Sequence, residues 1–72
     1  MTFHEVPAKR LAVGDLFVRH SAREEAERDG WAWRLLRHDF TVRGDYSSMV
    51  ECDGSDWTER FEPDELVWLA AP

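Results

Sequence analysis

The sequence predicts a small, mostly β domain, a barrel or sandwich of about five short strands. Short β-branched and aromatic runs recur between turn residues, and a strong hairpin signal, Asp53-Gly54, stands between two of them. The segment most compatible with a helix, residues 21–30, lacks the apolar stripe of a core helix. The chain has 72 residues and a mass of 8.5 kDa, which suffices for one small hydrophobic core. We therefore expect residues 1–72 to form a single domain.

The first expected elements are short. Thr2–Val6 alternates weakly and predicts a strand, which the following proline ends because it lacks an N–H for the ladder. Ala8–Leu11 is typical of one helical turn opened by that proline. Leu11 and Val13 are expected to point inward, ahead of a turn at Gly14-Asp15.

Leu16–His20 predicts the next strand, and its three adjacent apolar residues indicate that both faces of the sheet are covered there. The acidic segment Ser21–Gly30 carries the signals of a helix rather than a strand. Ser21 is a candidate N-cap, Glu24 stands at the capping-box spacing, and Gly30 can close the C-terminus of a helix. Because only two alanines are apolar, this segment predicts a short exposed helix or an ordered loop.

Residues 31–38 alternate as a strand does. One face would carry Trp31, Trp33 and Leu35, and the other Ala32, Arg34, Leu36 and His38. A helix would instead gather Trp31, Leu35 and His38 on one side. The preceding glycine and the aromatic residues favour the strand. Asp39–Asp45 then predicts a loop or a ragged strand.

Tyr46–Cys52 predicts another strand, and Asp53-Gly54 the hairpin turn that follows it. A two-residue turn would pair Val50 with Trp57, which favours packing, although it sets two acidic residues opposite each other. A four-residue loop avoids the acidic pair but sets Val50 opposite Glu59. The tight turn is preferred, and the longer loop stays open.

The end of the chain contains Pro63, which breaks the strand ladder. Residues 61–66 favour a single helical turn around that proline, with the preceding glutamate held extended. Val67–Leu69 predicts the last short strand, and Ala70–Pro72 a tail.

Two segments resemble a known fold. The Leu11–Val18 stretch resembles the entry of many small SH3-like barrels, in which a Leu-x-Val-Gly-Asp segment leads into a strand. The Asp53-Gly54 hairpin followed by Phe61–Val67 is similar to their closing turn and last strand. The resemblance covers roughly residues 7–20 and 46–69 and implies an SH3-like β-barrel with adaptor-like binding of peptides, modified side chains or nucleic acid. Residues 21–45 depart from a minimal barrel, and this insert would cover or build the usual groove.

The net charge of −6 is unevenly distributed: residues 1–44 sum to +1 and residues 45–72 to −7. A phosphate-binding surface needs the opposite sign, so the net charge disfavours general nucleic-acid binding. A local basic edge through Arg34, Arg37 and Arg43 is the exception. The acidic C-terminal part is expected to be a solvated face or a contact for a basic partner.

The composition also bears on the compartment. The lone Cys52 allows no internal disulfide, which favours a reducing cytoplasm. No run of about 18 apolar residues and no secretory signal is visible, so we expect no membrane association. The arginine-rich composition is compatible with a GC-rich bacterial or phage genome.

The sequence offers no motif for catalysis or metal binding. His4, His20, His38 and Cys52 are dispersed and lack the paired spacing of a zinc site. The segment Asp53–Asp56 lacks the residue order of a calcium loop. No serine stands in a Gly-x-Ser-x-Gly elbow, and the glycines stand singly, so no phosphate-cradling loop is present. We expect no enzymatic activity, no metal and no cofactor.

The aromatic residues are the most informative candidates for binding. Four tryptophans are many for this length, and a core of this size fully buries about two or three large rings. Interface anchors are enriched in tryptophan, tyrosine and arginine. The candidate binding residues are Trp31, Trp33, Arg34, Arg37, Tyr46 and Trp57.

These residues predict a non-catalytic protein-interaction module, a small regulatory or accessory protein of bacterial or phage origin. It would bind a partner protein through the aromatic and arginine patch, and the acidic C-terminal hairpin would add charge complementarity. Alternatively, the tryptophan rings serve only to fill the hydrophobic core. The alternative functions are a nucleic-acid-associated regulator, an acidic inhibitor that occupies a basic site on a host protein, and a homodimer that uses the aromatic patch as its own interface.

Overall fold

The computed structural model describes residues 2–40, 46–52 and 55–71, with side chains described for residues 2–37 and 59–71. The elements follow in the order β1 (Thr2–Pro7), the 3-10 turn η1 (Ala8–Arg10), β2 (Leu16–Arg19), the 3-10 turn η2 (His20–Ala22), α1 (Arg23–Asp29), β3 (Trp33–Phe40), β4 (Tyr46–Cys52), β5 (Ser55–Phe61) and β6 (Leu66–Ala71). Of the loop or ragged strand predicted at Asp39–Asp45, residues 39–40 belong to β3, and residues 41–45 lie outside the described residues.

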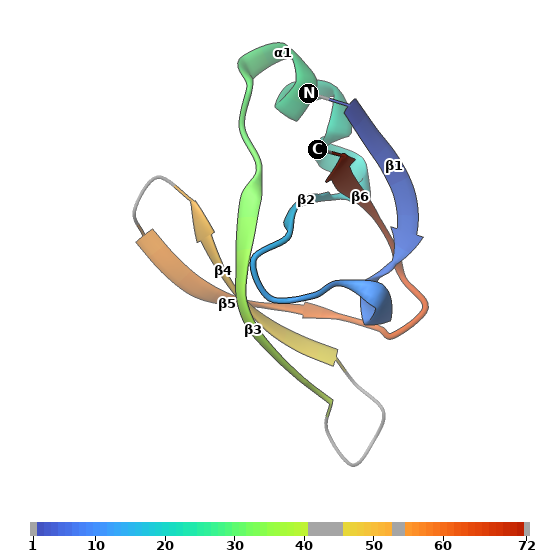
Figure 1. Ribbon diagram of the computed structural model, residues 1–72, viewed down its shortest axis with the longest axis vertical. Helices are drawn as coiled ribbons and strands as arrows, with labels where there is room; N and C mark the ends of the chain where they lie inside the picture. The colour runs from blue at the N-terminus through green and yellow to red at the C-terminus, as the bar shows by residue number, and fades with distance from the viewer. Residues whose placement is uncertain (1, 41–45, 53–54, 72) are drawn as a thin grey trace.

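The strands form one antiparallel sheet in the order β1-β6-β2-β3-β4-β5. The prediction of a mostly β fold with a small helix is confirmed. Closure into a barrel is not confirmed, because β1 and β5 stand at the two ends of this order and do not pair in the described part of the chain. Figure 1 shows β1 and β6 side by side, so that Thr2 lies opposite Ala71 near the chain ends.

The hairpin between β4 and β5 has the tight register. Val50 lies opposite Trp57, and Cys52 opposite Ser55 is the last pair. Two residues therefore separate the strands, as the Asp53-Gly54 signal predicts, although those two lie outside the described residues. The acidic pair Glu51 and Asp56 is retained at the cost of a mild repulsion.

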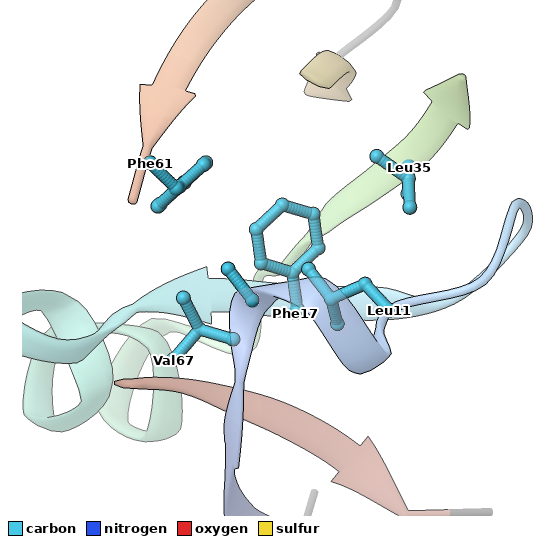
Figure 2. Close-up of a cluster of buried hydrophobic side chains, with 6 residues drawn as sticks. Leu11, Phe17, Leu35, Phe61 and Val67 are labelled. Carbon is cyan, nitrogen blue, oxygen red and sulfur yellow. The ribbon is translucent and has the colours of Figure 1, made fainter. Parts of the chain in front are cut away.

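Both faces of the sheet are covered where β2 crosses it, as the sequence predicts. Phe17 and Val18 are adjacent, point to opposite faces and are both fully buried. The inner core, on the face of Phe17, consists of Ala8, Leu11, Phe17, Leu35, Phe61 and Val67 (Figure 2). The helix-side core, on the face of Val18, consists of Phe3, Val18 and Ala26. The helix α1 therefore covers one face through its buried alanine, and η1 covers the other.

The sheet curls so that the end of β5 returns to β2, although two strands separate them in the sheet order. The ring of Phe61 meets that of Phe17 edge-on, with centroids 5.8 Å apart. The Arg19 guanidinium donates to Oε2 of Glu59 and Oε2 of Glu65, each at 3.0 Å, and to the carbonyl oxygen of Arg60 at 3.1 Å. Side-chain packing and this arginine thus connect strands that do not pair.

The structure corrects four local predictions. Ala70 and Ala71 are not a tail, because they pair with Phe3 and Thr2 as the end of β6. Ser21 is not the N-cap, because it lies inside the turn η2, and α1 is preceded by Ala22 without a side-chain cap. Val13 is 63% exposed rather than buried, because it stands in a turn closed by the hydrogen bond from the Asp15 N–H to the Ala12 oxygen, 3.0 Å. Around Pro63 the chain forms a β-turn in place of a helical turn, since the Glu65 N–H donates to the Glu62 oxygen at 3.0 Å.

The helix ends as predicted at Gly30, whose φ of 71° is left-handed. We expect Gly30→Ala to lower the free energy of unfolding by about 1 kcal/mol because a Cβ strains this backbone conformation. No heavy atom lies within 4 Å of the added Cβ, so the effect comes from the backbone and not from a clash. Gly30→Asn should lose less, because asparagine tolerates this region. Urea denaturation measures both, and two variants as stable as the parent would contradict the argument.

Candidate functional site

The candidate site centres on β3, whose register with β4 contains a β-bulge. The pairs on either side of the bulge are Arg34–Glu51, Leu35–Val50 and Arg37–Met49. Leu36 is therefore the additional residue. Positions 49 and 51 of β4 are two residues apart and share a face, so their partners Arg34 and Arg37 also lie on one face of the sheet. Strict alternation along β3 would have separated the two arginines.

The face of the sheet that carries Arg34 and Arg37 is the same face that α1 covers at β2. Leu16 of β2 lies opposite Arg34 and shares its face. Leu16 is also two residues from Val18, which belongs to the helix-side core. Arg34 and Arg37 therefore lie on the helix-side face of the sheet, and both side chains are exposed.

Among the described side chains, four of the eight lysines and arginines have an ion-pair partner within 4.0 Å: Lys9, Arg19, Arg23 and Arg28. Arg34 and Arg37, like Arg10 and Arg60, have none there, and the side chain of Glu51, which lies opposite Arg34, is outside the described residues. The register sets Arg34 opposite Glu51, whereas Arg37 lies opposite Met49. Arg37 is therefore the one of these two arginines with no acidic residue directly across from it on β4.

Trp31, two residues before β3, and Trp33, its first residue, are half-buried and divided between the two cores, so the prediction that they share one face is wrong. Trp33 packs against the inner core, with its ring edge-on to Phe17 at a centroid distance of 5.7 Å. Trp31 packs against the helix-side core, and its ring lies 6.1 Å from that of Trp33 at 46°. Trp31 therefore lies on the same side of the sheet as the two arginines, and Trp33 lies on the other side.

The remaining predicted residues, Tyr46 and Trp57, belong to β4 and β5. The register places them opposite Phe61 and Val50, and their side chains lie outside the described residues. We name the residues that the structure brings to one side, Trp31, Arg34 and Arg37, the β3 patch.

A second polar cluster, which the sequence did not indicate, surrounds Trp68. The His20 ring stacks on the indole with centroids 5.0 Å apart, and the Arg23 guanidinium lies 4.1 Å from the ring centroid. The indole N–H donates to the His20 carbonyl oxygen at 3.1 Å, and His20 Nε2 lies 2.7 Å from Oε2 of Glu5. These contacts attach η2 and α1 to the β1–β6 pair. Because they occupy the indole, we assign Trp68 to the fold and not to a binding patch.

Trp68→Phe is expected to lower the free energy of unfolding by about 1 kcal/mol, since it removes the hydrogen bond to the His20 oxygen but keeps an aromatic ring. Chemical denaturation measures the loss. The acceptor is a backbone oxygen, so the loss should persist in a His20→Ala background. A loss that disappears in that background would show that ring stacking, and not the hydrogen bond, was responsible.

Other chemistry is sparse in the described part of the chain. No group of three His, Cys, Asp or Glu side chains there is arranged to hold a metal ion. Asp29 raises the pKa of Arg28 above its ordinary value, through a hydrogen bond and through its charge. None of the described helices has the length and apolar character needed to cross a membrane.

The chain matches no protein-family model, no curated protein and no solved structure.

Proposed function

We propose that this protein is a non-catalytic interaction module that binds an acidic region of a partner protein through the β3 patch. One observation carries the proposal: the bulge at Leu36 sets the exposed side chains of Arg34 and Arg37 on one face of the sheet. Trp31, half-buried on the same side, supplies an aromatic surface beside them. Arginine and tryptophan are the residues most enriched among interface hot spots.

Charge favours a protein partner over a nucleic acid. The chain has a net charge of −6, and a nucleic acid would be repelled by the acidic residues around a small basic region. An acidic protein segment needs only a few opposite charges, which two arginines can contact through bidentate hydrogen bonds. The proposed partner is therefore a protein whose binding surface carries carboxylates.

The likeness to SH3-like barrels supports the same proposal by analogy. The curled sheet, in which Phe61 of β5 returns to Phe17 of β2, is the arrangement that a small barrel would have. Members of that fold group commonly act as adaptors without catalytic activity. This support concerns the fold alone, and the function rests on the β3 patch.

The test is capture of partners from nuclease-treated lysate of the source cell with three tagged proteins. Arg34→Glu/Arg37→Glu should lose the partner that the parent protein captures, because the variant repels carboxylates. Arg10→Glu/Arg60→Glu makes the same change in net charge at exposed arginines outside the patch and should keep it. Circular dichroism checks that all three proteins are folded.

Two outcomes would contradict the proposal. If the double variant at positions 34 and 37 still captures the partner, binding does not use the patch. If nuclease removes the captured material and raised salt weakens its capture steeply, the partner is a nucleic acid and the regulator alternative holds.

A further inference from the structure

Part of β3 has a free edge. On its β2 side, β3 pairs through Arg34, and the last hydrogen bonds join Leu35 to the Asp15 oxygen at 2.9 Å and to the Gly14 N–H at 2.8 Å. Residues 36–40 continue beside β4 on the other side, and no described strand pairs with them on the β2 side. Figure 1 shows β3 extending well past the point where the loop before β2 reaches it. An unpaired strand edge is a template for a further strand.

The direction of the backbone polar groups alternates along β3 and identifies the residues that face this edge. Both backbone groups of Leu35 point to the β2 side, so its pair with β4 lacks mutual hydrogen bonds. Pairs with and without hydrogen bonds alternate along β4, which has no additional residue at the bulge. The backbone groups of Arg37 and Asp39 therefore face β4. The N–H and C=O groups of His38 and Phe40 point to the free edge.

We propose that residues 36–40 of two copies of this chain pair as antiparallel strands about a two-fold axis at His38. In this register, Arg37 of each copy lies opposite Asp39 of the other. The inference goes beyond the proposed function and does not rest on it, because no partner protein takes part. Arg34 lies beside Leu16 of its own copy and stays outside the pairing.

The backbone leaves two copies three registers that pair three or more of these residues. Residues opposite each other in antiparallel strands either both bond the neighbouring strand or both turn away from it. His38 can therefore lie opposite His38, Phe40 or Leu36 of the second copy. Pairing with Phe40 would set Asp39 opposite Asp39. Pairing with Leu36 would set Arg37 opposite Arg37.

Charge selects the register centred on His38. Opposite charges stabilise antiparallel strands when they lie directly across from each other, and like charges destabilise them. Positions 37 and 39 share the helix-side face, because their partners on β4 are two residues apart. They would form pairs without mutual hydrogen bonds, in which the Cα atoms are closest, at about 4.5 Å. This register alone has two complementary charge pairs, and it alone pairs all five residues of the edge.

The expected dimer is weak. An edge of five residues buries less than the roughly 1,200 Å² of a stable interface, and the net charge of −6 on each copy opposes association. The charged residues of β3 itself are Arg34, Arg37 and Asp39, which sum to +1, so this repulsion does not arise at the edge. We therefore expect a monomer–dimer equilibrium that shifts with protein concentration.

Single cysteines identify the register. His38→Cys, Arg37→Cys and Asp39→Cys are compared under mild oxidation, each with Cys52→Ser so that no other thiol is present. Residues directly opposite lie within the Cα distance of a disulfide, whereas a shift by two residues exceeds it. We expect His38→Cys to form covalent dimers fastest, and Arg10→Cys, outside the edge, to form them slowly.

Charge reversal tests the attraction between the copies. Arg37→Asp and Asp39→Arg each set like charges opposite each other and should weaken the dimer in sedimentation equilibrium by about tenfold. Arg37→Asp/Asp39→Arg restores opposite charges and should restore the dimer. Arg10→Asp makes the same change in net charge as Arg37→Asp at an exposed site and should leave dimerisation almost unchanged. Circular dichroism checks that each variant is folded.

Three results would overturn the inference. The first is a parent protein that stays monomeric over about a hundredfold range of concentration. The second is faster cross-linking through position 37 or 39 than through position 38, which would show another register. The third is a folded double variant that stays monomeric. All of these measurements use the protein alone, so their failure is distinct from a failure of the proposed function.

Discussion

Phe17→Ala is expected to lower the free energy of unfolding by about 3–5 kcal/mol. Phe17 is fully buried at the centre of the inner core, and its ring contacts those of Trp33 and Phe61 edge-on. The substitution removes the burial of the ring, both aromatic contacts and the link between β2 and β5. A domain of this length has roughly 4–11 kcal/mol of stability in total, so much of it is lost.

Urea denaturation followed by tryptophan fluorescence measures this effect. Because Phe17→Ala can leave too little folded protein to fit, Phe17→Leu provides a second point and should lose about 1–2 kcal/mol. Val13→Ala is the control for an apolar residue at the surface and should change stability by less than about 0.5 kcal/mol. Equal losses at positions 13 and 17 would show that the inner core is wrongly placed.

Arg19→Met is expected to lower the free energy of unfolding by about 2 kcal/mol. The guanidinium of Arg19 makes charge-assisted hydrogen bonds to Glu59 and Glu65 and lies 4.3 Å from the centroid of the Phe61 ring. Its side chain is 32% exposed, which places the pairs between surface and buried ion pairs in strength. Methionine keeps much of the packing but leaves two half-buried carboxylates beside each other.

Thermal unfolding compares this variant with Arg28→Met, whose ion pair with Asp29 is exposed and should contribute almost nothing. Arg19→Lys should lose an intermediate amount, because one ammonium group cannot reproduce the fork of a guanidinium. Glu65→Gln should partly rescue Arg19→Met by removing one of the two adjacent negative charges. Equal melting temperatures for Arg19→Met and Arg28→Met would show that Arg19 does not connect β2 to β5.

Local chemistry predicted most of the strands. Two adjacent buried residues, Phe17 and Val18, indicated a strand covered on both faces, and a tight turn at Asp53-Gly54 predicted the register of β4 with β5. Errors arose where one local signal competed with another. Val13 continued an apolar pattern, but the turn that Gly14 and Asp15 form directs it to solvent.

The candidate site was harder to predict, because it depends on the bulge. The sequence Trp33-Arg34-Leu35-Leu36-Arg37 alternates well enough for a regular strand, and no residue type in it marks an insertion. The bulge follows from the pairing with β4, which is a tertiary property. Likewise, Arg19 is 40 residues from Glu59 in the chain, and only the curl of the sheet brings them together.

Amide hydrogen exchange tests most directly whether the partner binds the β3 patch. The exchange of the protein is compared with and without the partner captured from nuclease-treated lysate. We expect new protection confined to residues 31–40, and none in Arg34→Glu/Arg37→Glu at the same partner concentration. Protection in β1 or in the turn between β5 and β6, with residues 31–40 unchanged, would place the interface elsewhere and contradict the account.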